Sequence, residues 1–188
     1  REINRFVSDV NSEQEPLLEQ YKEEQQEEIV ELVKTEIQLI DAIVDQTTNS
    51  NSEQITRTIM NAPIAANGVL VDPFLTDFIN RVANGIADLI RKGYVNSYTT
   101  PQLIQELIGT RSLKFRDGFL NRVRNWNKAV VNTSVQHASS IAVREITRSL
   151  YERYLWVSVL DDRTTLICRS RNNNIYVYGE GPVPPAHI

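Results

Sequence analysis

The residues best suited to chemistry lie near the C-terminal end of this chain. Their order is Trp156, Asp161, Asp162, Arg163, Thr164, Cys168, Pro184, Pro185 and His187. Carboxylates, a guanidinium, a thiol and an imidazole can bind anions or metals and can move protons. Their spacing does not follow a helical period, so we expect loops and turns to hold them.

Asp162, Arg163 and Thr164 follow an apolar run and are typical of a tight turn. In such a turn a carboxylate can accept hydrogen bonds from backbone amides, and a guanidinium can clamp a neighbouring strand or loop. A plain polar turn between two strands would explain the same residues. We predict an architectural role, which ties this turn to the segment around Pro184, Pro185 and His187.

Cys168 is the only cysteine, and His187 is one of two histidines. Structural zinc sites use four Cys or His ligands, so these two residues could bind zinc only with ligands beyond the chain end. A nucleophilic Cys168 with His187 as its base would need a third, orienting group. A buried thiol and a hydrogen-bonded loop imidazole are the simpler interpretation, and we predict no metal, no cofactor and no catalytic residue. His137, within an Ala- and Ser-rich segment, is predicted to pack or cap.

Charge is distributed unevenly along the chain. Residues 1–50 carry 13 acidic and 4 basic side chains, whereas residues 111–171 carry 12 basic and 5 acidic ones. A basic segment of this kind can face phosphates, although solvated helix faces explain it equally well. The predicted contacts to double-stranded DNA, without sequence preference, are Arg111, Lys114, Arg116, Arg122, Arg124 and Lys128.

Hydrophobic periodicity predicts four helices that must position these residues, over about 17–44, from Asp72 and Pro73 onward, over 100–109 and over 117–151. β-favouring runs at 155–160 and 175–178 then predict a hairpin. The fold class is therefore mainly α with a small C-terminal β-element (α+β). We expect an acidic amphipathic arm at 1–50, a linker at 51–72 and a domain at 73–188.

The arm carries an apolar stripe at helical spacing that calls for a partner, either in another chain or in this one. The residues predicted to dock on a partner are Val33, Ile37, Ile40 and Val44.

Composition excludes several classes of protein. The chain of 188 residues is 41% hydrophobic with only seven glycines and seven prolines, so collagen-like and low-complexity classes do not apply. One cysteine rules out an internal disulfide framework. The sequence shows no apolar run near 18 residues, no signal-peptide pattern and no common phosphate-loop, zinc or hydrolase signature. We expect a soluble, unexported helical interaction protein.

The C-terminal motif resembles that of phage head morphogenesis proteins, the minor head proteins of the phage Mu F type. Their pattern is a Trp, Asp-x-Arg-Thr, a Cys, a short hairpin and Pro-Pro-x-His, with a Cys-Arg pair downstream. The matching residues are Trp156, Asp161 to Thr164, Cys168, Pro184, Pro185 and His187. The segments TTPQLIQELIG and NTSVQHASSIAVRE resemble helices of that family, so the resemblance covers roughly 75–188. Asn132 and the Asn172–Asn174 run depart from the pattern.

The resemblance implies a non-enzymatic minor component of a tailed-phage head. Its expected partners are the portal protein, other head proteins and double-stranded DNA, with no membrane involved during assembly. Its expected role is head morphogenesis, DNA packaging or genome ejection, in the virion after assembly in the host cytoplasm. The expected Cys-Arg pair falls after Ile188, so the predicted domain would be truncated at its C-terminal end. A zinc-stabilised nucleic-acid module and a small enzyme using Asp162, Cys168 and His187 remain the alternatives.

Overall fold

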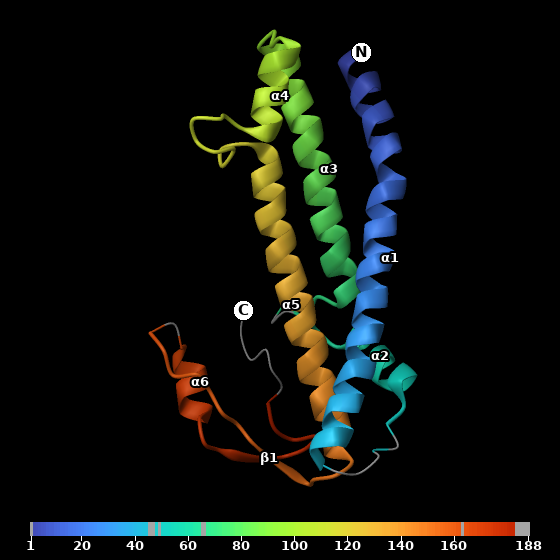
Figure 1. Cartoon of the computed structure of the whole chain (residues 1–188), viewed down its shortest axis with the longest axis vertical. Helices are drawn as coiled ribbons and strands as arrows, with labels where there is room; N and C mark the ends of the chain where they lie inside the picture. The colour runs from blue at the N-terminus through green and yellow to red at the C-terminus, as the bar shows by residue number, and fades with distance from the viewer. Residues whose placement is uncertain (1, 45–47, 49, 65–66, 163, 183–188) are drawn as a thin grey trace. The chain divides into compact units, whose positions relative to one another are not determined.

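The computed structural model (Figure 1) describes residues 2–44, 48, 50–64, 67–162 and 164–182. Within these ranges helices dominate and only two short strands occur, which confirms the predicted mainly helical fold with a small C-terminal β-element. The elements are α1 (Glu2–Val44), α2 (Ser52–Asn61), α3 (Val71–Val95), α4 (Thr100–Ile108), α5 (Phe119–Arg148), β1 (Arg153–Leu155), α6 (Leu166–Arg171) and β2 (Ile175–Val177).

The first helix is longer than its apolar stripe predicts, because it begins at Glu2 rather than near Leu17. Its acidic front part has few apolar residues, and only some of them are packed, since Phe6 and Leu17 are exposed. Val7 is buried, and the ring of Tyr21 lies 5.5 Å from that of Phe78 on α3. Tertiary packing of this kind supplies the stability that helix propensity alone does not.

A helix, α2, lies where the sequence predicts a linker at 51–72. Asn51 caps it, because its side-chain oxygen accepts hydrogen bonds from the amides of Glu53 and Gln54 at 3.0 and 3.2 Å. Ile55 and Ile59, four residues apart, are both buried. The linker prediction is therefore wrong for this stretch, since its polar residues include a helix cap and its isoleucines form a buried face.

The chain divides into two compact units. Unit 1 comprises residues 1–27 and 72–133, and unit 2 comprises residues 28–71 and 134–188. Residues of the predicted arm thus belong to both units, and neither of them consists of the arm alone.

In unit 1, the front of α1, α3 and the front of α5 lie side by side (Figure 1), with aromatic contacts between them. Trp126 on α5 meets Phe119 edge-on at 6.1 Å, and the guanidinium of Arg81 on α3 lies 5.5 Å from the Trp126 ring. Asp72, where the sequence predicts this helix to begin, is its second residue and pairs with Lys22 at 2.9 Å. This ion pair and the aromatic contacts link all three helices.

In unit 2, the second part of α5 supplies small buried side chains. Ala138 and Ala142 are fully buried, together with the larger Ile146. His137 lies on the same helix, and its Nε2 is 3.2 Å from the carbonyl oxygen of Ile59 on α2. The prediction that His137 packs within the protein is confirmed.

The C-terminal hairpin pairs β1 with β2 in antiparallel register. Tyr154 lies opposite Tyr176, and Leu155 lies opposite Ile175. The predicted strand over 155–160 is wrong beyond Leu155, and the connection between the strands contains the unpredicted helix α6. After Leu155 the backbone of Trp156 bonds to Asn173 and Asn174 and the Ser158 amide donates to the Asn172 side chain, whereas the Val159 carbonyl accepts from Thr164.

Burial lowers the pKa of His137 and thereby makes the stability of the fold depend on pH. The pKa of its imidazole lies below the usual 6.5 because burial disfavours the charged form, an effect only partly opposed by the hydrogen bond to Ile59. Its Nδ1 has no hydrogen-bond partner among the described residues. The folded chain therefore favours neutral His137, and His137 binds a proton more readily in the unfolded chain.

We expect the free energy of unfolding to fall as pH decreases below about 6.5. In this range His137 is protonated in the unfolded chain but stays neutral in the folded one, because burial lowers its pKa. Urea denaturation at a series of pH values would measure this dependence. His137→Gln, which keeps a donor for Ile59, should flatten the profile just below pH 6.5. An unchanged profile in that variant would contradict the assignment to His137.

Candidate functional site

The C-terminal motif is organised around Trp156. This side chain is buried, and its Nε1–H donates to the Ser158 hydroxyl at 3.0 Å. The Ser158 hydroxyl in turn donates to the backbone carbonyl of Cys168 at 2.8 Å. The guanidinium of Arg171 lies 5.6 Å from the Trp156 ring centre. Trp156 therefore attaches the segment after β1 to α6.

The asparagine run contributes to the same arrangement, a role that the sequence analysis missed. The Asn172 side-chain oxygen accepts from the Ser158 amide at 2.8 Å, and the Asn173 amide donates to the Trp156 carbonyl at 2.8 Å. Asn173 adopts a positive φ of 63°, a conformation that asparagine tolerates better than most residues. Three consecutive asparagines are typical of a turn, so the sequence did indicate one here. The spacing could not show that Trp156 and Ser158 are the partners of these asparagines.

The predicted turn is held by Thr164 and Asp161. The Asp161 amide donates to the Thr164 hydroxyl oxygen at 2.8 Å, and that hydroxyl donates to the Val159 carbonyl. The Thr164 amide donates to the Asp161 carbonyl at 3.1 Å, and Arg169 donates to the same carbonyl at 3.2 Å. A hydroxyl can donate and accept at once, so one threonine joins both sides of the turn.

Asp162 itself is exposed, and the hydrogen bonds that the structure describes in this turn are those of its neighbours Asp161 and Thr164. A carboxylate only accepts, and the groups to be joined here include a carbonyl, which needs a donor. Arg163, Pro184, Pro185 and His187 lie outside the described residues. Their predicted roles, including the tie between the turn and the Pro-Pro-x-His segment, stay predictions.

Thr164→Val should lower the free energy of unfolding by about 1–2 kcal/mol, because it removes the hydroxyl that joins Asp161 to Val159. Asp162→Ala is the matched control in the same turn and should change stability by less than about 0.5 kcal/mol, as exposed substitutions do. Urea denaturation of both variants would test this. A larger loss of stability in Asp162→Ala than in Thr164→Val would instead assign the capping role to Asp162.

A pocket of about 640 Å³ lies in unit 2 beside this motif. Its wall includes Val143, Tyr154, Trp156, Val159 and Cys168. Burial raises the pKa of the Tyr154 hydroxyl, which stays protonated and donates to the carbonyl of Pro182. Apolar walls with a few hydroxyl groups are suited to binding an apolar group.

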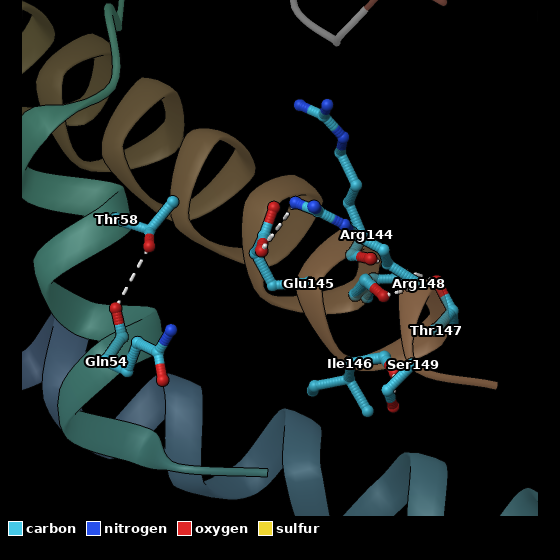
Figure 2. A network of polar contacts seen from close by, with 9 residues as sticks. Gln54, Thr58, Arg144, Glu145, Ile146, Thr147, Arg148 and Ser149 are labelled. Atoms are coloured by element: carbon cyan, nitrogen blue, oxygen red, sulfur yellow. Dashed lines mark hydrogen bonds and ion pairs between the residues drawn. The ribbon is translucent and has the colours of Figure 1, made fainter. Parts of the chain in front are cut away.

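The end of α5 forms one edge of this pocket, and Figure 2 shows its polar contacts. Glu145 pairs with Arg148 at 3.7 Å, within one turn of the helix. The Thr147 hydroxyl lies 2.7 Å from that of Tyr178. Arg144 lines the pocket and has no ion-pair partner in the described part of the chain. It therefore offers a positive charge to anything that enters the pocket.

Cys168 lies in α6, half-buried and without a disulfide. The Thr165 side chain accepts from its amide at 3.4 Å and caps the helix. No group of three or more His, Cys, Asp or Glu side chains that could hold a metal occurs in the described ranges. The zinc and nucleophile interpretations both require His187, which falls outside those ranges.

The six cations predicted to contact DNA all belong to unit 1, and all are exposed. None of them forms an ion pair with a described residue. Arg124 and Lys128 are four residues apart and share a face of α5, whereas Arg122 lies on another side over the Phe119 ring. The remaining three, Arg111, Lys114 and Arg116, precede α5 in the loop after α4.

The predicted docking stripe is largely used within the chain itself. Residues 29–44 are helical, as predicted, but Val33 and Ile40 are buried in unit 2, and Ile37 and Val44 are half-buried. The carboxylate of Glu36 accepts from the Ser139 hydroxyl on α5 at 2.5 Å. Val33 and Ile40 are thus buried within this chain, which is one of the two alternatives that the sequence left open. A partner contact at the half-buried Ile37 and Val44 stays a prediction.

None of the helices in the described ranges is long and apolar enough to cross a membrane. Comparison with known proteins found no match among protein-family models, curated proteins or solved structures. The interpretation of function therefore rests on the motif and on the geometry given above.

Proposed function

We propose that this chain is a minor structural protein of a tailed-phage head, associated with the portal vertex. The observation that carries the proposal is the ordered C-terminal motif from Trp156 to Cys168, which resembles that of the Mu F type. Its described members Trp156, Thr164 and Cys168 take part in hydrogen bonds to backbone groups of the motif, directly or through Ser158. Contacts of this kind support an architectural role for the motif.

In this proposal the chain acts in head morphogenesis, DNA packaging or genome ejection. The exposed cations of unit 1 would face the packaged DNA, because unpaired surface charge attracts phosphates over nanometre distances. The portal contact must use a surface other than the stripe around Val33, which the chain buries itself.

Incorporation into heads tests the proposal. A tagged chain supplied during phage growth should co-sediment with heads and portal protein on a density gradient, in few copies per head. A tagged Ile43→Asp variant, altered at a position 71% exposed on α1, is the matched control and should be incorporated normally. Assembly of complete heads with the wild-type chain left among the free proteins would contradict the proposal.

A further inference from the structure

The α4–α5 loop, residues 109–118, is fixed at its base. The Asp117 carboxylate accepts from the Thr110 amide at 2.8 Å and from the Thr110 hydroxyl at 2.9 Å. A Cβ at Gly118 would lie 2.3 Å from the carbonyl carbon of Ile108, so only glycine fits there. From this base the loop projects sideways, away from α4 and α5 (Figure 1).

The tip of the loop holds two large apolar side chains in solvent. Leu113 is 57% exposed and Phe115 is 50% exposed. Lys114 and Phe115 both have a positive φ, 52° and 59°, which is uncommon for residues with bulky side chains. The Phe115 amide nevertheless donates to the Thr110 carbonyl at 2.9 Å, so the turn is closed by hydrogen bonds. The backbone geometry therefore keeps these apolar groups away from the core.

Three cations alternate with the apolar residues of the tip. Arg111, Lys114 and Arg116 are exposed and form no ion pair within the described ranges. The one carboxylate of the loop, Asp117, is already hydrogen-bonded to Thr110. The loop thus combines uncompensated positive charge with exposed apolar surface.

We propose that the α4–α5 loop binds the headgroup region of an anionic lipid bilayer. Leu113 and Phe115 would enter the interface, and the cations would contact the lipid phosphates and carboxylates. Double-stranded DNA would also attract the cations, but its phosphate backbone would leave both apolar side chains in water. The apolar tip is the feature that favours the bilayer, and this inference does not depend on the proposed phage function.

Flotation of the whole chain with vesicles tests the proposal. Vesicles of phosphatidylcholine containing about 30% phosphatidylserine should bind the wild-type chain, and pure phosphatidylcholine vesicles should bind it much less. The double variant Leu113→Ser, Phe115→Ser should lose about tenfold or more in affinity for the anionic vesicles. Its affinity for a short DNA duplex, measured in parallel, should not change, because the cations remain.

Leu17→Ser is the matched control, since Leu17 is 66% exposed, more than Leu113 or Phe115, but lies in the acidic part of α1. It should bind anionic vesicles like the wild type. A Phe115→Trp variant gives a second measurement, with a blue shift of its fluorescence expected on anionic vesicles only. Absence of wild-type binding, or equal binding by the double serine variant, would overturn the proposal, and duplex binding in that case would assign the cations to nucleic acid.

Discussion

Val33→Asp should destabilise unit 2 by about 4 kcal/mol or more, because it places an unpaired carboxylate where the native side chain is fully buried. That loss is a large part of the total stability of an ordinary domain. Urea denaturation followed by circular dichroism would measure it. If the variant does not fold at all, Val33→Ala provides the milder change and should cost about 2 kcal/mol.

Ile43→Asp on the same helix is the control, because Ile43 is exposed and its replacement leaves no carboxylate buried. It should shift the free energy of unfolding by no more than about 0.5 kcal/mol. Equal stability of the two aspartate variants would mean that the stripe is not packed within the chain. The stripe would then be interpreted as a docking surface for a partner.

The α1 stripe shows which features of a helix can be predicted from hydrophobic periodicity and which cannot. The spacing of Val33 and Ile40 correctly predicted a helix with one buried face, because a 3.6-residue repeat places both side chains on one side. It could not identify the tertiary contacts of this part of the helix, since their partners lie far away in the sequence. Ser139 on α5, which donates to Glu36, is 103 positions further along the chain.

Local signals also failed where two of them compete. The polar residues before Ile55 predicted a linker, although Asn51 among them is a helix cap. Likewise, the β-favouring residues after Leu155 predicted a longer strand, but the Trp156 and Ser158 side chains bond to one another and towards α6 instead of allowing the sheet to continue. A local helix cap decided the first region, and hydrogen bonds between Ser158 and the more distant Cys168 and Asn172 decided the second.

The candidate site was predicted in its location but not in its contacts. Asp162 and Thr164 were placed correctly in one turn, yet the turn depends on a hydroxyl that both donates and accepts. Residue type alone makes a carboxylate look like the stronger cap. Only the positions of the surrounding amides and carbonyls show that a donor is needed.

Trp156→Ala should cost about 3–5 kcal/mol of stability, because it empties the space filled by the largest buried side chain of the motif. Trp156→Phe should cost less, about 1–2 kcal/mol, since it keeps a ring but removes the Nε1–H that donates to Ser158. Circular dichroism during urea denaturation suits both variants. Fluorescence is less suitable, because the only tryptophan that remains, Trp126, lies in unit 1.

Tyr151→Ala removes an exposed aromatic side chain close by in the same unit and should be nearly neutral. If Trp156 is architectural, Trp156→Phe should reduce incorporation into heads and Trp156→Ala should reduce it further, in line with the stability of the two variants. A Trp156→Ala chain that stays fully stable yet is excluded from heads would contradict this role. Trp156 would then have to contact a partner directly, and the hydrogen bonds that attach it to α6 would serve to orient its ring rather than to hold the hairpin.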